Sequence, residues 1–172
     1  GLTALSFANK RNFKQWPRLV QIAWGFLDGK RANNIKVFLI RPERFSISRS
    51  AEFIHGVSQR RALTEGVDVK EVLGLLGSDL IKAEKVVAHN LRFDLGVLKG
   101  EAIRGGISLA QPASLECTSS VGRDFLKNGK NKNEMFPRLI DLHAELFGIG
   151  FAPCHDARSD VSARLRVKEL GF

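Results

Sequence analysis

Apolar and polar positions along the chain follow patterns that predict a series of short strands and helices. Residues 18–28 and 35–42 are rich in β-branched and aromatic side chains, and the polar link 29–34 between them is typical of a β-hairpin. Over 69–81 the apolar positions have helical spacing. In chain order the sequence predicts strands over 18–28 and 35–42, helices over 48–62 and 69–81, a strand over 85–89, a helix over 90–104, a strand over 114–118, and helices over 137–147 and 156–170.

Single residues mark the expected ends of several of these elements. Gly56 is expected to break the helical segment 48–62, and Asn90 is a suitable N-cap for the helix that follows it. Pro137 suits the first turn of a helix, and Gly148 is a typical residue at which such a helix ends.

The order of the elements predicts an α/β fold. A hairpin followed by alternating helices and strands indicates a mixed β-sheet flanked by helices in a three-layer domain. The length of 172 residues suits a single domain. A sheet of this kind normally has a further strand before residue 18, and residues 2–8 are the only candidate for it in this sequence.

The charge and the cysteines narrow the choice of partner and compartment. Twenty-seven Lys and Arg against 18 Asp and Glu give a net charge of +9. This excess is compatible with a polyanionic partner, and equally with a basic surface that has no such partner. No apolar run approaches the length that spans a bilayer, so no membrane partner is expected. Cys117 and Cys154 are isolated, which is typical of reduced thiols in an intracellular, cytoplasmic protein.

The segment HNLRFD has residues that suit a catalytic site. It occupies positions 89–94, where a buried strand passes into a helix, and ligands of α/β proteins bind at such strand ends. Asp94 is expected on the first turn of that helix, facing the crevice. A carboxylate at this position also has an ordinary structural explanation, since it complements the positive end of the helix dipole.

A second such segment, HDARSD, lies near the end of the sequence. His155 precedes the last predicted helix and Asp160 lies one turn inside it, so both can face the same end of the sheet. A histidine beside carboxylates suits a general base that acts on a metal-bound water. The ordinary alternative is a helix-capping Asp156 with an exposed Asp160.

Together these segments resemble the motifs of the DEDDh 3′–5′ exonucleases, a superfamily that includes the proofreading subunits of bacterial replicases. VVAHNLRFDLGVL resembles the second motif of that superfamily, and CHDARSDV resembles the third, His-x4-Asp. The surrounding segments follow in the family's order and spacing: WPRLVQIAW, LIRPERFSI, AEFIHGVS, LECT and FPRLIDLHAELFG. The resemblance covers the chain from Trp16 to its end and implies a ribonuclease-H-like fold.

The resemblance implies an enzyme that removes nucleotides from the 3′ end of DNA, which is favoured over RNA, with the help of two divalent ions. Asp94 and Asp160 would bind the metal, and His155 would deprotonate the attacking water. Such oxygen ligands suit Mg²⁺ or Mn²⁺. The implied partners are single-stranded 3′ ends, together with the subunits of a polymerase or nucleoprotein complex.

Three further residues are assigned to the substrate by the same resemblance. His55 and Phe93 match positions that line the 3′-nucleotide pocket of the family, and Asn90 would bind the substrate beside them. For His55 and Phe93, packing in the core is the stronger alternative. His89 is expected to pack or form a hydrogen bond at the strand end, and His143 is expected to be half-buried on its helix.

The sequence departs from the family at its first motif, Asp-x-Glu, because no Asp or Glu occurs before Asp28. In one explanation, Gly1 and Leu2 are the pair that follows this motif, and the acidic strand is encoded upstream. In the other, residues 2–8 form the opening strand with Ser6 and Ala8 in place of the acids. The chain would then be an inactive relative that serves as a nucleic-acid-binding or structural subunit. Since two carboxylates hardly hold two divalent ions, little activity is expected from the chain as given.

Overall fold

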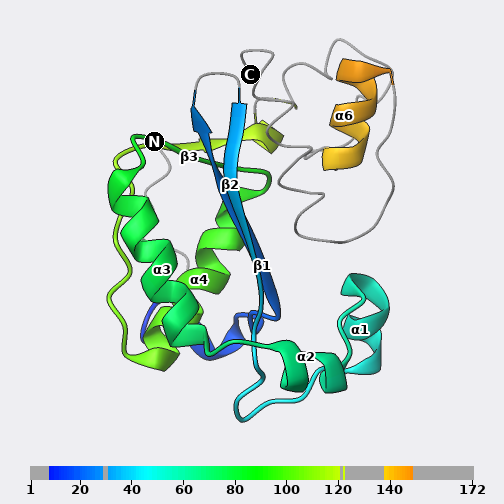
Figure 1. Cartoon of the computed structure of the whole chain (residues 1–172), viewed down its shortest axis with the longest axis vertical. Helices are drawn as coiled ribbons and strands as arrows, with labels where there is room; N and C mark the ends of the chain where they lie inside the picture. The colour runs from blue at the N-terminus through cyan, green and yellow to red at the C-terminus, as the bar shows by residue number, and fades with distance from the viewer. Residues whose placement is uncertain (1–7, 29–30, 121, 123–137, 149–172) are drawn as a thin grey trace. The chain divides into compact units, whose positions relative to one another are not determined.

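The helices and strands follow the order that the sequence predicts. The computed structural model describes residues 8–28, 31–120, 122 and 138–148. Its elements are η1 (Phe13–Gln15), β1 (Gln21–Asp28), β2 (Arg31–Leu39), α1 (Arg49–His55), α2 (Gln59–Glu65), α3 (Val69–Lys82), β3 (Val86–Ala88), α4 (Leu91–Gly105), β4 (Leu115–Cys117) and α6 (Leu139–Phe147) (Figure 1). The mixture of helices and β-strands confirms the predicted α/β class.

The chain divides into two compact units. Of the described residues, unit 1 contains 8–22, 38–86 and 91–115, and unit 2 contains 23–28, 31–37, 87–90, 116–120, 122 and 138–148. The predicted last helix, 156–170, lies outside the described residues, as do the polar loop 128–134 and nearly all of the candidate opening strand 2–8. The assignment of one domain to the whole chain therefore stays a prediction.

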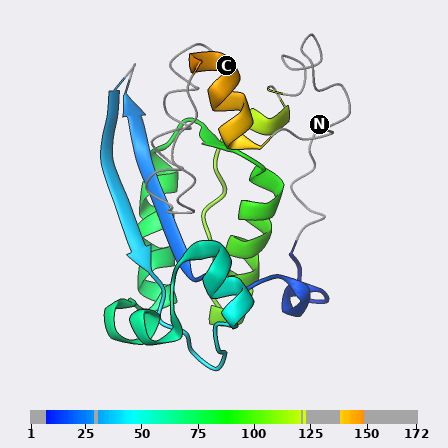
Figure 2. The ribbon, with the colours of Figure 1, turned by 90° about the vertical axis from the view of Figure 1, so that its right-hand side faces the viewer.

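The predicted hairpin is present, but its loop is shorter than expected. β1 and β2 pair with each other and run in opposite directions (Figure 2). The polar link predicted over 29–34 is wrong for its last four residues, because β2 already begins at Arg31. Polar residues can extend a strand because its pairing is made by backbone hydrogen bonds, which do not depend on the side chain. Within this segment Asn34 adopts a φ of 52°, a left-handed value that Asn tolerates better than most residues.

β3 and β4 form a second two-stranded sheet. Its pairing begins where the Val86 amide donates to the Ser114 carbonyl over 2.9 Å. In unit 1, a parallel bridge joins Ile40 to Val67, with the Val67 amide bonded to the Leu39 carbonyl at 2.8 Å. The strands predicted over 85–89 and 114–118 are therefore confirmed, each with slightly tighter bounds.

The core of unit 1 lies between α3 and α4, which pack against each other. The helical spacing predicted over 69–81 is confirmed, because α3 buries the apolar side chains on one face: Val69, Val72, Leu73 and Leu76. Helix α4 contributes Leu91, Val97 and Ala102 to the buried set. Asp68 caps α3 by accepting hydrogen bonds from the amides of Lys70 and Glu71.

The predictions for residues at helix ends agree with the structure at some positions and not at others. Gly56 ends α1 in the left-handed conformation, as predicted for a break in this segment. Asn90 precedes α4, but its φ of 58° is left-handed, whereas N-cap residues are typically extended. Pro137, expected in the first turn of a helix, lies outside the described residues, and the N-cap of the described helix α6 is Arg138. The Arg138 guanidinium binds the Asp141 carboxylate from this position, at 2.7 and 3.0 Å.

Helix α6 supplies buried side chains to unit 2. Leu142 is 1% exposed, and His143 is 2% exposed with its ring 4.5 Å from that of Phe147. The expectation that His143 is half-buried is therefore wrong, because the aromatic packing places the imidazole in the interior. Gly148 ends the helix with a φ of 70°, as predicted. None of the described helices is long and apolar enough to cross a lipid bilayer.

Candidate active site

Asp94 lies where the sequence places it. β3 ends at Ala88, α4 begins at Leu91, and Asp94 is the acidic residue of the first turn of that helix. The positive end of the helix dipole favours an ionised carboxylate at this position. Its Oδ2 atom is buried and has no hydrogen-bond partner among the described residues, while Asp94 as a residue makes other interactions.

Trp16 fixes the same turn of α4 from one side. Its indole ring lies against Gly96, and a Cβ atom at this glycine would overlap the ring. The ring also contacts Phe93, with the two centroids 6.5 Å apart and the planes inclined by 52°. Because Phe93 and Gly96 flank Asp94 in sequence, Trp16 constrains the backbone that carries the carboxylate.

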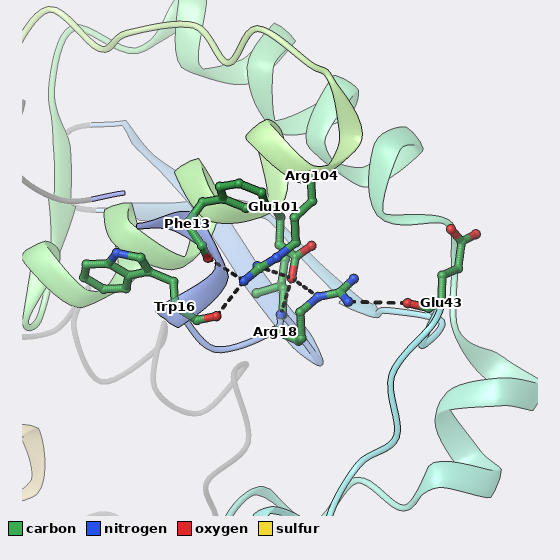
Figure 3. A network of polar contacts seen from close by, with 7 residues as sticks. Phe13, Trp16, Arg18, Glu43, Glu101 and Arg104 are labelled. Carbon is green, nitrogen blue, oxygen red and sulfur yellow. Dashed lines mark hydrogen bonds and ion pairs between the residues drawn. The ribbon is translucent and has the colours of Figure 1, made fainter. Parts of the chain in front are cut away.

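A buried carboxylate further along α4 holds the segment that contains Trp16 (Figure 3). Oε1 of Glu101 accepts hydrogen bonds from Arg18 Nε at 2.8 Å, from the Leu19 amide at 3.0 Å and from Arg104 Nη1 at 3.1 Å. Arg104 in turn donates through Nη2 to the Phe13 carbonyl at 2.7 Å.

The same guanidinium nitrogen reaches the Trp16 carbonyl at 2.6 Å. Residues 13–19 are thereby attached to α4 both by charge and by the packing of the indole on Gly96. Sequence reasoning did not identify this network. Arg18 and Glu101 are 83 residues apart, and a glutamate on a helix is usually exposed.

His55 ends α1, and Figure 1 shows this short helix set apart from the α3–α4 pair. Its Nδ1 atom accepts a hydrogen bond from the Val57 amide at 3.1 Å, which requires that this nitrogen carry no proton. Nε2 is buried without a hydrogen-bond partner among the described residues. Burial lowers the pKa of His55, and the charge of Glu52 opposes this in part. The burial and the hydrogen bond accepted by Nδ1 both favour the neutral imidazole.

Some of the other predicted site residues lie in the described structure, and the rest lie outside it. Phe93 is 47% exposed, so the core-packing interpretation of this residue is wrong. Asn90 and His89 form the turn between β3 and α4, and His89 Nδ1 is 3.0 Å from the Thr118 hydroxyl, which confirms the expected hydrogen bond at the strand end. His155 and Asp160 lie outside the described residues, so their convergence on Asp94 stays a prediction.

The described residues do not by themselves form a metal site. No group of three or more His, Cys, Asp or Glu side chains in this part of the chain is arranged to hold an ion. Asp94 is the one predicted metal ligand that lies within it, and a single carboxylate does not fix a divalent cation. Cys117 forms no disulfide in the described structure, and Cys154 lies outside the described residues, so the reduced state expected for both stays a prediction.

No family model and no curated protein matches the sequence. Solved structures do match. Escherichia coli Exonuclease I in complex with a dT13 oligonucleotide superposes with a TM-score of 0.73 at 20% identity, over 90% of this chain and 37% of that one. The chain has the fold of this exonuclease. Its zinc-bound form in complex with single-stranded DNA gives a TM-score of 0.72 at 20% identity, over 89% and 36% of the two chains.

A shorter protein of the same kind also matches. Exonuclease X in complex with 5′-overhanging duplex DNA gives a TM-score of 0.57 at 18% identity, over 88% of this chain and 82% of that one. The likeness confirms the predicted ribonuclease-H-like fold. The chain spans little more than a third of Exonuclease I but most of Exonuclease X.

Proposed function

We propose that the chain is a 3′–5′ exonuclease domain that hydrolyses phosphodiester bonds at the 3′ end of DNA, with RNA as the less favoured substrate. One observation supports this proposal more than any other. Within a fold that matches Exonuclease I over 90% of the chain, the motif residue Asp94 lies on the first turn of the helix that follows a β-strand. Strand ends of this kind are where α/β proteins bind their ligands.

The proposal assigns three residues to catalysis. Asp94 and Asp160 would hold divalent ions, for which Mg²⁺ or Mn²⁺ is suited by the oxygen ligands, and Exonuclease I has been solved with zinc. Such ions, when bound, would supply positive charge for the oxygens that attack and leave the phosphorus. His155 would accept the proton of the attacking water.

Substrate binding is proposed for the residues that the resemblance assigned to it. Phe93 presents a half-exposed ring directly beside Asp94, which suits contact with a terminal base or sugar. His55 has a buried Nε2 atom without a hydrogen-bond partner among the described residues, and Asn90 lies at the start of α4. The net charge of +9 favours the binding of nucleic acid in general.

A second candidate function applies if the gene encodes no acidic pair for the first motif, since none of residues 1–27 is Asp or Glu. The chain would then be an inactive relative that binds nucleic acid as a subunit of a nucleoprotein or polymerase complex. The two functions differ in whether carboxylates beyond Asp94 and Asp160 complete the metal site.

Both candidates are tested with the full-length product of the gene that encodes this chain. Single-stranded DNA labelled at its 3′ end is incubated with Mg²⁺ or Mn²⁺, and the release of nucleotides is measured. We expect Asp94→Asn and Asp160→Asn to slow release on the order of a hundredfold or more, because each substitution removes a metal ligand. His155→Ala is expected to cost roughly a hundred- to ten-thousandfold.

Asp68→Asn is the matched control, because Asn caps a helix about as well as Asp. We expect this variant to retain full activity. Binding of DNA without any cleavage by the unmodified protein would favour the inactive subunit. Equal rates for Asp94→Asn and Asp68→Asn would contradict the proposed role of Asp94.

A further inference from the structure

Helix α1 presents apolar side chains to solvent. None of its seven residues is buried, and Phe53 and Ile54 are 92% and 60% exposed. The helix is nevertheless well defined, because the Ser48 hydroxyl accepts a hydrogen bond from the Ala51 amide and Gly56 ends the helix in a left-handed conformation. Aromatic side chains contribute much of the energy of interfaces, so an outward-facing Phe53 on a capped helix is placed to contact a partner.

Three exposed arginines lie on α1 or close to it in the sequence. Arg49 precedes Phe53 by four positions, so the two side chains lie on the same side of α1, one turn apart. Arg44 and Arg60 are also exposed, on the segment before α1 and on α2. Within the described part of the chain, none of these three arginines forms an ion pair, whereas Arg18, Arg61 and Arg104 are each paired with a carboxylate.

The combination fits single-stranded nucleic acid better than it fits a protein. Unpaired bases offer flat apolar faces that stack on an aromatic ring, and the phosphates between them pair with arginine. A stable protein interface buries about 800 Å² on each side. Two exposed apolar side chains on a helix of seven residues supply only a small part of such an area.

We propose that Phe53 and Arg49 form a contact for unpaired nucleotides, in which a base stacks on the Phe53 ring and the adjacent phosphate pairs with the Arg49 guanidinium. This contact rests on the proposed function, because an enzyme that shortens a 3′ end also has to hold the strand behind it. The contact predicts that single-stranded nucleic acid is the preferred substrate, because the bases of a duplex are stacked on each other and leave no free face for the Phe53 ring.

The contact is tested by binding, separately from catalysis. The full-length gene product is titrated into fluorescein-labelled oligo(dT) in EDTA, and anisotropy gives the dissociation constant. We expect Phe53→Ala to weaken binding about five- to hundredfold, in line with the loss of one stacked base. Ile81→Ala is the matched control, because Ile81 is 77% exposed on α3, and it should bind as tightly as the unmodified protein.

Three further variants separate stacking from charge. Phe53→Trp should bind normally, and its additional tryptophan emission should be quenched by oligo(dT). Arg49→Gln should lower the slope of the logarithm of affinity against the logarithm of salt concentration by about one. Phe53→Leu keeps an apolar side chain without the aromatic ring, and it should bind weakly if stacking is the cause.

Equal affinities for Phe53→Ala and Ile81→Ala would overturn the contact, even if the protein degrades DNA. Weak binding by Phe53→Ala in a protein without nuclease activity would leave the contact standing and remove the proposed function. Should Phe53→Ala bind oligo(dT) normally but no longer co-purify with a protein subunit, α1 would be a protein interface and the proposed contact would be wrong.

Discussion

The buried Glu101 carboxylate allows a sharp test of how residues 13–19 are attached to α4. Glu101 is 1% exposed, and its three hydrogen bonds all go to Oε1, two of them from the arginines Arg18 and Arg104. Replacing Glu101 by Gln keeps the shape of the side chain but removes the charge. Both guanidinium groups then remain largely buried, at 27% and 16% exposure, without a carboxylate.

The expected loss of stability follows from this geometry. Breaking a buried ion pair by removing one partner costs about 3–5 kcal/mol, and a hydrogen bond to a charged group contributes about 1.5–3 kcal/mol. Gln still offers a neutral acceptor to the Leu19 amide, so we expect Glu101→Gln to lower the free energy of unfolding by about 2–4 kcal/mol. Glu101→Ala leaves no acceptor and should cost about 3–5 kcal/mol.

An exposed pair of the same chemistry provides the control. Glu65 accepts from Arg61 at 3.0 Å with both side chains at least half exposed, and such pairs contribute about 0–1 kcal/mol. Urea unfolding, followed by circular dichroism, should therefore show little change for Glu65→Gln. If Glu101→Gln costs no more than Glu65→Gln, the network around Glu101 does not hold residues 13–19 in place.

Two other predictions concern the turn that carries Asp94 and the end of α1. Gly96→Ala places a methyl group inside the Trp16 ring, so we expect a loss of about 1–3 kcal/mol in urea unfolding and a slower exonuclease. Unchanged stability and rate would show that Trp16 does not constrain this turn. His55 has a lowered pKa, so its contribution to stability is present above its unfolded pKa of about 6.5 and is lost as the pH falls. The free energy of unfolding should fall more between about pH 7.5 and about pH 5 in the unmodified protein than in His55→Gln, and parallel curves would contradict this.

The sequence was sufficient where a local pattern determines the structure. The spacing of Val69, Val72, Leu73 and Leu76 predicted both α3 and its buried face, because apolar residues at helical spacing need a partner surface. The position of Asp94 was also predictable, since the short apolar run before it predicts a strand and the segment 90–104 was expected to form a helix.

Features that depend on distant residues were not predictable in this way. From the sequence alone, Glu101 is expected to be an exposed residue of a helix. Only the fold shows that Arg18 lies beside it. Nothing in the local sequence indicates that Phe53 is exposed, and the structure shows its side chain to be 92% exposed. The early start of β2 is determined by backbone pairing with β1, which the polar side chains of residues 31–34 do not reveal.

The direction of degradation tests the proposed function most directly. Full-length protein is incubated in Mn²⁺ with single-stranded DNA labelled at its 5′ end, with and without a phosphorothioate linkage at the 3′ terminus. We expect the labelled strand to shorten one nucleotide at a time, the phosphorothioate to slow this markedly, and Asp94→Asn to slow it on the order of a hundredfold or more. Immediate release of the labelled 5′ nucleotide, cleavage at internal positions, or an unchanged rate in Asp94→Asn would contradict a 3′–5′ exonuclease.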